Sequence, residues 1–290
     1  MTAIFVREVR SAFSGMMGWL LTAFLTAASG LYFMANNLGF GLTDFGYYTL
    51  YQTSFVLLVY VPVLAMRSLA GERHARTDQL LLTSPVPVWG IVLGKYFAMC
   101  AVFALPCLAD AAMILALRAL GCTNTALAAN FASLLGYYLL GCAAIALCEW
   151  ISGLTENQIV AAVLGFAALL LAFLMPSLRS LFTAGSAMAL VAFTLLAAAA
   201  AVLAGLRSRS LTLGCILFAV LAAGISALFL FRGGWLTGAF SGVLEALCLF
   251  APFEKFVNGS FSVPAVVYYL SAAGLFLFFT AQGIEKRRWV

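Results

Sequence analysis

The sequence has few charged side chains. Only 9% of its 290 residues are Asp, Glu, Lys or Arg, whereas 65% are hydrophobic. Soluble globular domains are about one quarter charged, because a surface that faces water needs polar groups. Histidine is nearly absent, with His74 as the single residue, and the seven cysteines form no CxxC pair. The scarcity of charge excludes an ordinary soluble domain, and the shortage of ligands predicts no metal site.

Motifs that carry catalysis or nucleotide binding are also missing. One histidine does not support an HExxH site, and we find no Ser-His-Asp set. The stretch from Gly90 to Lys95 has a spacing too short for a phosphate-binding loop, and no Ser or Thr follows the lysine. We therefore expect no enzyme activity and no cofactor in this chain. The 15 basic residues form no long run, so nucleic acid is not an expected partner.

Long apolar runs are what the sequence has in abundance. A helix needs about 20 residues, at about 1.5 Å each, to cross a hydrocarbon core of about 30 Å. The runs lack the alternating pattern of membrane β-barrels. They predict an all-α, polytopic membrane protein with about eight transmembrane helices in a single domain over residues 1–290. The expected spans are residues 16–35, 46–70, 90–117, 130–152, 158–178, 185–206, 211–231 and 264–284.

Residues 1–15 precede the first span and carry a helical pattern of their own. Phe5, Val9 and Phe13 fall on one helical face, while the charged residues point elsewhere. This pattern is typical of an N-terminal interfacial helix that lies along the membrane surface. A plain charged leader is the alternative.

The basic residues around the loops predict the orientation in the membrane, since cytoplasmic loops carry the excess of Lys and Arg. Four basic residues belong to one side: Arg118, Arg179, Arg232 and Lys255. The other side has eleven: Arg7, Arg10, Arg67, Arg73, Arg76, Lys95, Arg207, Arg209, Lys286, Arg287 and Arg288. The bias places both termini and the polar stretch 71–88 in the cytoplasm. Two prolines, Pro85 and Pro87, limit any helix in that stretch to residues 71–84.

Two carboxylates lie within or at the edge of the spans, where a charge is costly. Asp110 lies eight residues before Arg118, so it either lines a polar substrate path or pairs with that arginine near the outer interface. Glu149 lies next to Trp150 near the cytoplasmic end of its span. It either belongs to the same path or is an ordinary interfacial carboxylate.

Three stretches carry a resemblance to a known family: residues 70–95, residues 154–163, and residues 253–289. The first resembles the loop after the second span of type-2 ATP-binding-cassette (ABC) permeases, the exporter class. Together the three are similar to the gliding-motility branch of that class. The common pattern in the class has six spans, so the expected hairpin 185–231 is additional.

The resemblance implies a permease subunit in the bacterial inner membrane that couples ATP hydrolysis, in a separate subunit, to substrate movement across the bilayer. Its partners would be a cytoplasmic ATP-binding subunit, which holds ATP and magnesium, and a second permease copy or relative. Residues 71–84 would form the coupling helix. The expected contacts with the ATPase are Glu72, Arg73, Arg76, Asp78, Leu80, Leu81 and Leu82, and Thr155, Glu156 and Asn157 form a second cytoplasmic turn.

Three other functions remain in view. A secondary transporter usually has several membrane carboxylates and two related halves. A scaffold for surface machinery would lack an associated ATPase. A membrane enzyme would need catalytic groups that the sequence does not provide.

Overall fold

A computed structural model of the chain describes residues 2–76, 87–120, 126–182, 194, 242, 245 and 248–288, without the side chains of 178–182 and 288. All regular structure in these residues is helical. The chain forms two compact units, residues 1–171 with 249–290 and residues 172–248. The candidate site lies in the first unit.

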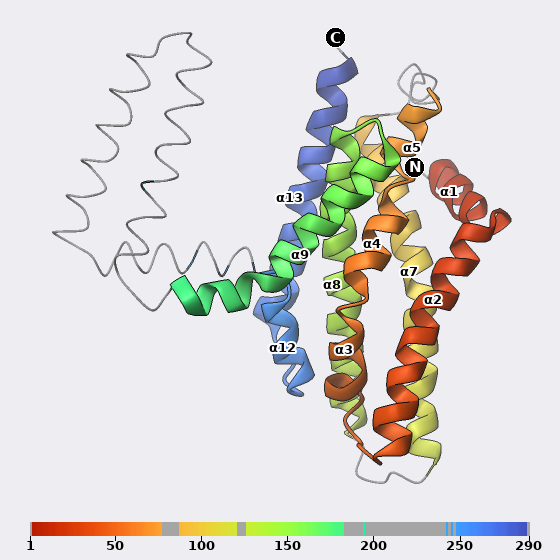
Figure 1. The fold of residues 1–290 in the computed structure, drawn as a ribbon. Coiled ribbons are helices and arrows are strands. Elements are labelled where there is room, and N and C mark those ends of the chain that lie inside the picture. The colour runs from red at the N-terminus through yellow and green to blue at the C-terminus, as the bar shows by residue number, and fades with distance from the viewer. Residues whose placement is uncertain are drawn as a thin grey trace. The chain divides into compact units, whose positions relative to one another are not determined.

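Long apolar helices dominate the first unit (Figure 1). Five described segments are long and apolar enough to cross a bilayer, and a bent pair of helices makes a sixth. The five are α2 (Met16–Tyr32) continued by the π-helix η1 (Phe33–Gly39), α7 (Val88–Ala119), α8 (Leu127–Leu154), α9 (Gln158–Phe182) and α13 (Val263–Arg288). The predicted all-helical membrane architecture is confirmed. These segments coincide with six expected spans, and the other two, 185–206 and 211–231, lie outside the described residues.

The sixth segment is broken rather than straight. It consists of η2 (Gly46–Leu50), α3 (Tyr51–Thr53), α4 (Leu57–Ala65) and α5 (Leu69–His74), and its two halves meet at an angle of 45°. Thr53 Oγ1 donates to the Thr49 carbonyl at 2.8 Å, and Ser54 Oγ donates to the Tyr51 carbonyl at 2.6 Å. Such hydroxyl bonds compete with the helical ladder, and Pro62 in α4 lacks a backbone N–H.

The N-terminal helix α1 (Thr2–Ser14) lies across the end of the upright helices, close to α5 (Figure 1). Its connection to α2 is tight. A Cβ added at Gly18 would lie 2.5 Å from the Ala12 carbonyl oxygen, so this position requires glycine. Trp19 Nε1 donates to the Phe13 carbonyl at 3.0 Å, and the two rings meet edge to face. These contacts fix α1 on α2.

The centre of the first unit is α8, which packs against α4, α7, α12 (Ala251–Val257) and α13. Gly141 lets Phe103 of α7 approach the α8 backbone, because a Cβ there would meet its ring at 2.1 Å. Phe256 lies against Gly136 in the same way. Aromatic side chains therefore cover α8 at both glycines. The chain termini lie at the same end of this unit as α5 (Figure 1).

Candidate functional site

A buried lysine lies at the end of the first unit where α1, α5 and α7 meet. The side chain of Lys95 is 1% exposed. Its Nζ lies 2.9 Å from Glu72 Oε1 of α5 and 3.2 Å from Glu8 Oε1 of α1, and it donates to the Ser68 carbonyl at 3.3 Å. An ammonium group has three donors, and all three find an oxygen. Burial of this charge is therefore compensated, which an unpaired lysine could not achieve.

Arg7 completes the group. Its Nη2 lies 2.5 Å from Glu8 Oε1 and 2.8 Å from Glu72 Oε1. We call Arg7, Glu8, Glu72 and Lys95 the charge cluster. Both cations contact the same two carboxylate oxygens, Glu8 Oε1 and Glu72 Oε1. The charge cluster therefore joins α1 and α5 to the N-terminal end of α7.

Electrostatics reinforce the cluster. Burial by itself raises the pKa of the Glu8 carboxyl, but the attraction of Lys95 and the hydrogen bonds from Arg7 and Lys95 outweigh it, and the pKa falls below its ordinary value. The hydrogen bond to Glu8 raises the pKa of Arg7. Glu8 and Arg7 therefore remain ionised at neutral pH.

A second set of bonds joins α5 to the carboxyl end of α8. Arg73 donates to the backbone carbonyl of Gly153 and, at 3.5 Å, to that of Thr155. The Ala70 amide donates to Ser152 Oγ at 3.0 Å. The last carbonyls of a helix have no partner within the helix, so a cation is favourable at this end.

The expected cytoplasmic turn lies beside this junction. Asn157 Oδ1 accepts from the Ile159 amide at 2.9 Å and so begins α9. Glu156 is 79% exposed and lies 4.0 Å from Arg287 of α13, a contact that contributes little at a surface. The structure thus brings α5, the turn Thr155–Asn157 and the end of α13 together.

The polar stretch after the second span is described only in part. Helix α5 ends at His74, and Arg76 has a φ of 54°, a left-handed conformation that interrupts a helix. The expected coupling helix 71–84 overlaps α5 at residues 71–74. Asp78, Leu80, Leu81 and Leu82 lie outside the described residues. Glu72, which is only 16% exposed, and Arg73 both bind groups of this chain. Arg76 is exposed.

The two carboxylates of the expected path are both buried, in different helices. Asp110 of α7 is 1% exposed and Glu149 of α8 is 0% exposed. No oxygen of either carboxylate has a hydrogen-bond partner among the residues that the structure describes. Arg118 is exposed and forms no ion pair with Asp110 within that part of the chain. Glu149 lies five residues before the end of α8, the end that Arg73 and Ser152 join to α5.

Comparison with known families finds one match, over just under half of the chain. Residues 40–182 match the family described as ABC-2 family transporter protein. The match supports an ABC-2 type permease. The matched range contains α5, the turn after α8, and the helices that carry Lys95, Asp110 and Glu149, whereas α1 precedes it. No curated protein and no solved structure matches the chain.

Sequence reasoning missed three residues of the charge cluster and expected a functional role only for Glu72. Lys95 and Arg7 looked like topology signals, and Glu8 looked like part of the polar face of α1. The signal that identifies Lys95 is its place eight residues into α7, among apolar neighbours, where a lysine needs a carboxylate. The sequence does not indicate which carboxylates pair with Lys95, because Glu72 and Glu8 lie 23 and 87 residues away from it.

Proposed function

We propose that the chain is the transmembrane permease subunit of an ABC exporter, driven by a separate ATP-binding subunit. The observation that carries the proposal is the family match over residues 40–182. Stretches 70–95, 154–163 and 253–289 favour the gliding-motility branch within the class. ATP and magnesium belong to the partner, and a second permease copy or relative completes the transporter.

The proposed docking surface is the end of the first unit that carries α5, the turn Thr155–Asn157 and the chain termini (Figure 1). Glu72 and Arg73 already bind α1, α7 and α8, so we assign them to holding α5 in place. Arg76, Asp78, Leu80, Leu81 and Leu82 remain the proposed contacts for the ATPase. This end then faces the cytoplasm, and both termini are cytoplasmic.

The charge cluster gives the proposal a physical basis for coupling. A force on the segment after α5 acts directly on α4 through the chain and on α7 through the Glu72–Lys95 pair. Residues 46–74 and α7 would then move together as a rigid body when the ATPase changes shape. Asp110 and Glu149 are the proposed polar residues of the path, and their burial implies that α7 and α8 must separate from a neighbour to expose them.

The decisive experiment is purification in mild detergent from native membranes, followed by mass spectrometry of partners and an ATPase assay. We expect a stoichiometric ATP-binding subunit with activity. Leu81→Asp should detach it, because a charge placed in an apolar contact remains unpaired. Thr123→Asp, in the loop expected on the other side, is the matched control and should retain it. Retention by Leu81→Asp would refute the docking assignment, and a permease that purifies alone would refute the proposal.

A secondary transporter is the second candidate, and one observation favours it. Two buried carboxylates without hydrogen-bond partners, in the described part of α7 and α8, are the type of group that couples transport to protons. Transport by liposomes that contain the permease alone, driven by a pH gradient without ATP, would support this candidate. A requirement for ATP and the partner would exclude it.

A further inference from the structure

A cavity of about 530 Å³ lies between α1, α2, α4, α5 and α7. Its lining changes from charged to apolar along each long helix. The lining residues of α7 are Lys95 and then, further along the helix, Ala98, Met99 and Val102. On the opposite wall the lining changes from Arg67 to Leu64 and Val63 of α4. Seven residues of helix span about 10 Å. The cavity therefore has a polar end beside the charge cluster and an apolar end deeper in the helices.

The polar end has an excess of positive charge. Arg7, Arg67 and Lys95 face two carboxylates, Glu8 and Glu72. The charge cluster neutralises itself, but the exposed Arg67 has no ion pair with any described side chain. Its guanidinium is the group that remains available at the mouth of the cavity, with its planar array of donors suited to a phosphate.

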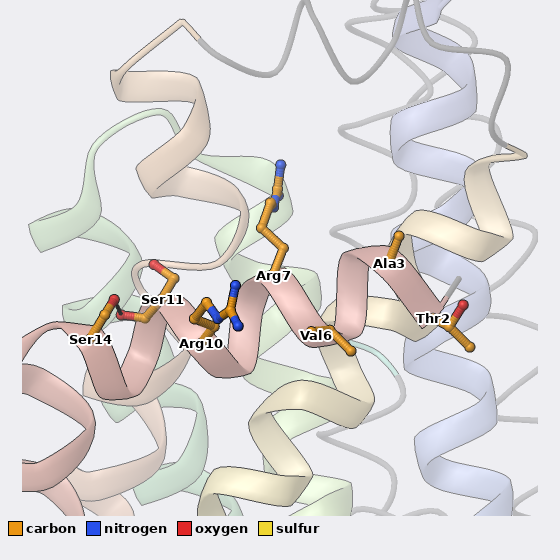
Figure 2. Close-up of a pocket in the computed structure, with 7 residues that line it drawn as sticks. All are labelled: Thr2, Ala3, Val6, Arg7, Arg10, Ser11 and Ser14. Atoms are coloured by element: carbon orange, nitrogen blue, oxygen red, sulfur yellow. Dashed lines mark hydrogen bonds between the residues drawn. The ribbon is translucent and has the colours of Figure 1, made fainter.

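A second hollow continues this basic surface along α1. Figure 2 shows its lining, which comes from one helix: Thr2, Ala3, Val6, Arg7, Arg10, Ser11 and Ser14. Arg7 and Ser11 line both the hollow and the cavity. Arg10 adds another cation without an ion pair among the residues described. Hydroxyl and guanidinium donors on a helix of this kind match the headgroup level of a membrane.

We propose that the cavity holds one anionic phospholipid of the surrounding bilayer, with its phosphate at Arg67 and one acyl chain along Leu64, Met99 and Val102. The volume falls within the range of about 300–1,000 Å³ for small-molecule sites, so it takes the headgroup end and a chain rather than a whole lipid. A lipid tail gains little by leaving other tails for leucine. The preference for this lipid must therefore come from the headgroup charge.

The site is distinct from the proposed path and does not depend on an ATPase. Asp110 and Glu149 do not line it, whereas α1 and the charge cluster do. The lipid would fill the space between α1 and the spans, next to the Glu72–Lys95 pair. Its binding would stabilise the docked position of α1.

The test uses the full chain, delipidated in neutral detergent, with phosphatidylglycerol or phosphatidylcholine of identical chains. Native mass spectrometry counts bound lipids, and the thermal midpoint reports stabilisation. We expect one retained phosphatidylglycerol and a raised midpoint, with little effect of phosphatidylcholine. Arg67→Gln should weaken phosphatidylglycerol binding about tenfold or more, since a hydrogen bond to a charged group is lost. Arg118→Gln, an exposed arginine at the other end of α7, is the matched control and should bind normally.

A second variant tests the apolar end. Val63→Trp should fill the chain site and abolish retention of phosphatidylglycerol, while Arg67→Gln should bind phosphatidylglycerol and phosphatidylcholine equally weakly. Equal binding of the two lipids to the wild type would overturn the proposal. So would equal behaviour of Arg67→Gln and Arg118→Gln.

Discussion

The charge cluster at the N-terminal end of α7 differs from the two buried carboxylates Asp110 and Glu149 in how burial is compensated. In the charge cluster, Lys95 is 1% exposed and its three donors reach Glu8, Glu72 and a backbone carbonyl. Asp110 in α7 and Glu149 near the carboxyl end of α8 are as deeply buried, and their oxygens have no partner among the described residues. A compensated charge holds helices in one arrangement, whereas an uncompensated one favours another state in which it meets water, a proton or a substrate. The contrast separates a positioning site from candidate residues of the path.

The largest expected effect is at Lys95. Lys95→Met removes the buried one of the two cations and leaves only Arg7 to balance two carboxylates, which should destabilise the first unit by about 3 kcal/mol. The thermal midpoint of the purified protein in detergent measures this loss. The double variant with Glu72→Gln leaves one carboxylate for the one cation, Arg7, and should recover part of it. An unchanged midpoint in Lys95→Met would show that the cluster does not hold these helices.

A smaller effect is expected from pH, through Glu8. Its pKa in the folded protein lies below the ordinary value of 4.5, so the ionised form is bound more favourably in the folded state. The resulting stability is present above pH 4.5 and is lost as the pH falls through the lower, folded pKa. Partly exposed ion pairs contribute about 1 kcal/mol or less.

The comparison of wild type with Glu8→Gln isolates this contribution from the other carboxylates. Their thermal midpoints should differ above pH 5 and converge as the solution becomes more acidic. A difference that stays constant with pH would mean that Glu8 acts through packing rather than through its charge, and the pairing with Arg7 and Lys95 would lose its role.

The architecture could be predicted from the sequence because it depends on local composition. Apolar runs of about 20 residues identify spans without knowledge of their neighbours, and the segments of α2, α7, α8 and α13 begin and end within a few residues of their predicted bounds. The pattern Phe5, Val9, Phe13 likewise predicted a helix where α1 lies. The break in the second span was not predicted, since a run of apolar residues gives no angle.

The site could be predicted only in part, because its partners are distant in sequence. Residues eight apart in a helix differ by about 80° beyond two full turns, which is enough to leave Arg118 exposed while Asp110 is buried. Glu149 was expected at an interface, but its helix is the central one and protein surrounds the side chain. The bonds of Arg73 to the end of α8 join residues 80 or more apart. Periodicity does not predict contacts of this length.

The smallest effect on stability is expected at the uncompensated carboxylates. Asp110→Asn and Glu149→Gln keep the shape of the side chain and remove an ionisable group whose oxygens have no hydrogen-bond partner among the described residues. Their thermal midpoints should therefore be no lower than that of the wild type, whereas Glu72→Gln, the same change within the charge cluster, should lower it.

At Asp110 and Glu149 we expect substitutions to reduce activity while leaving stability unchanged. If Asp110 and Glu149 belong to the path, their neutral variants should reduce the ATPase rate of the co-purified complex several-fold and flatten its pH profile, at unchanged stability. A loss of stability equal to that of Glu72→Gln would instead mean that these carboxylates support the fold. The distinction between the charge cluster and these two carboxylates would then disappear, because both would hold helices together.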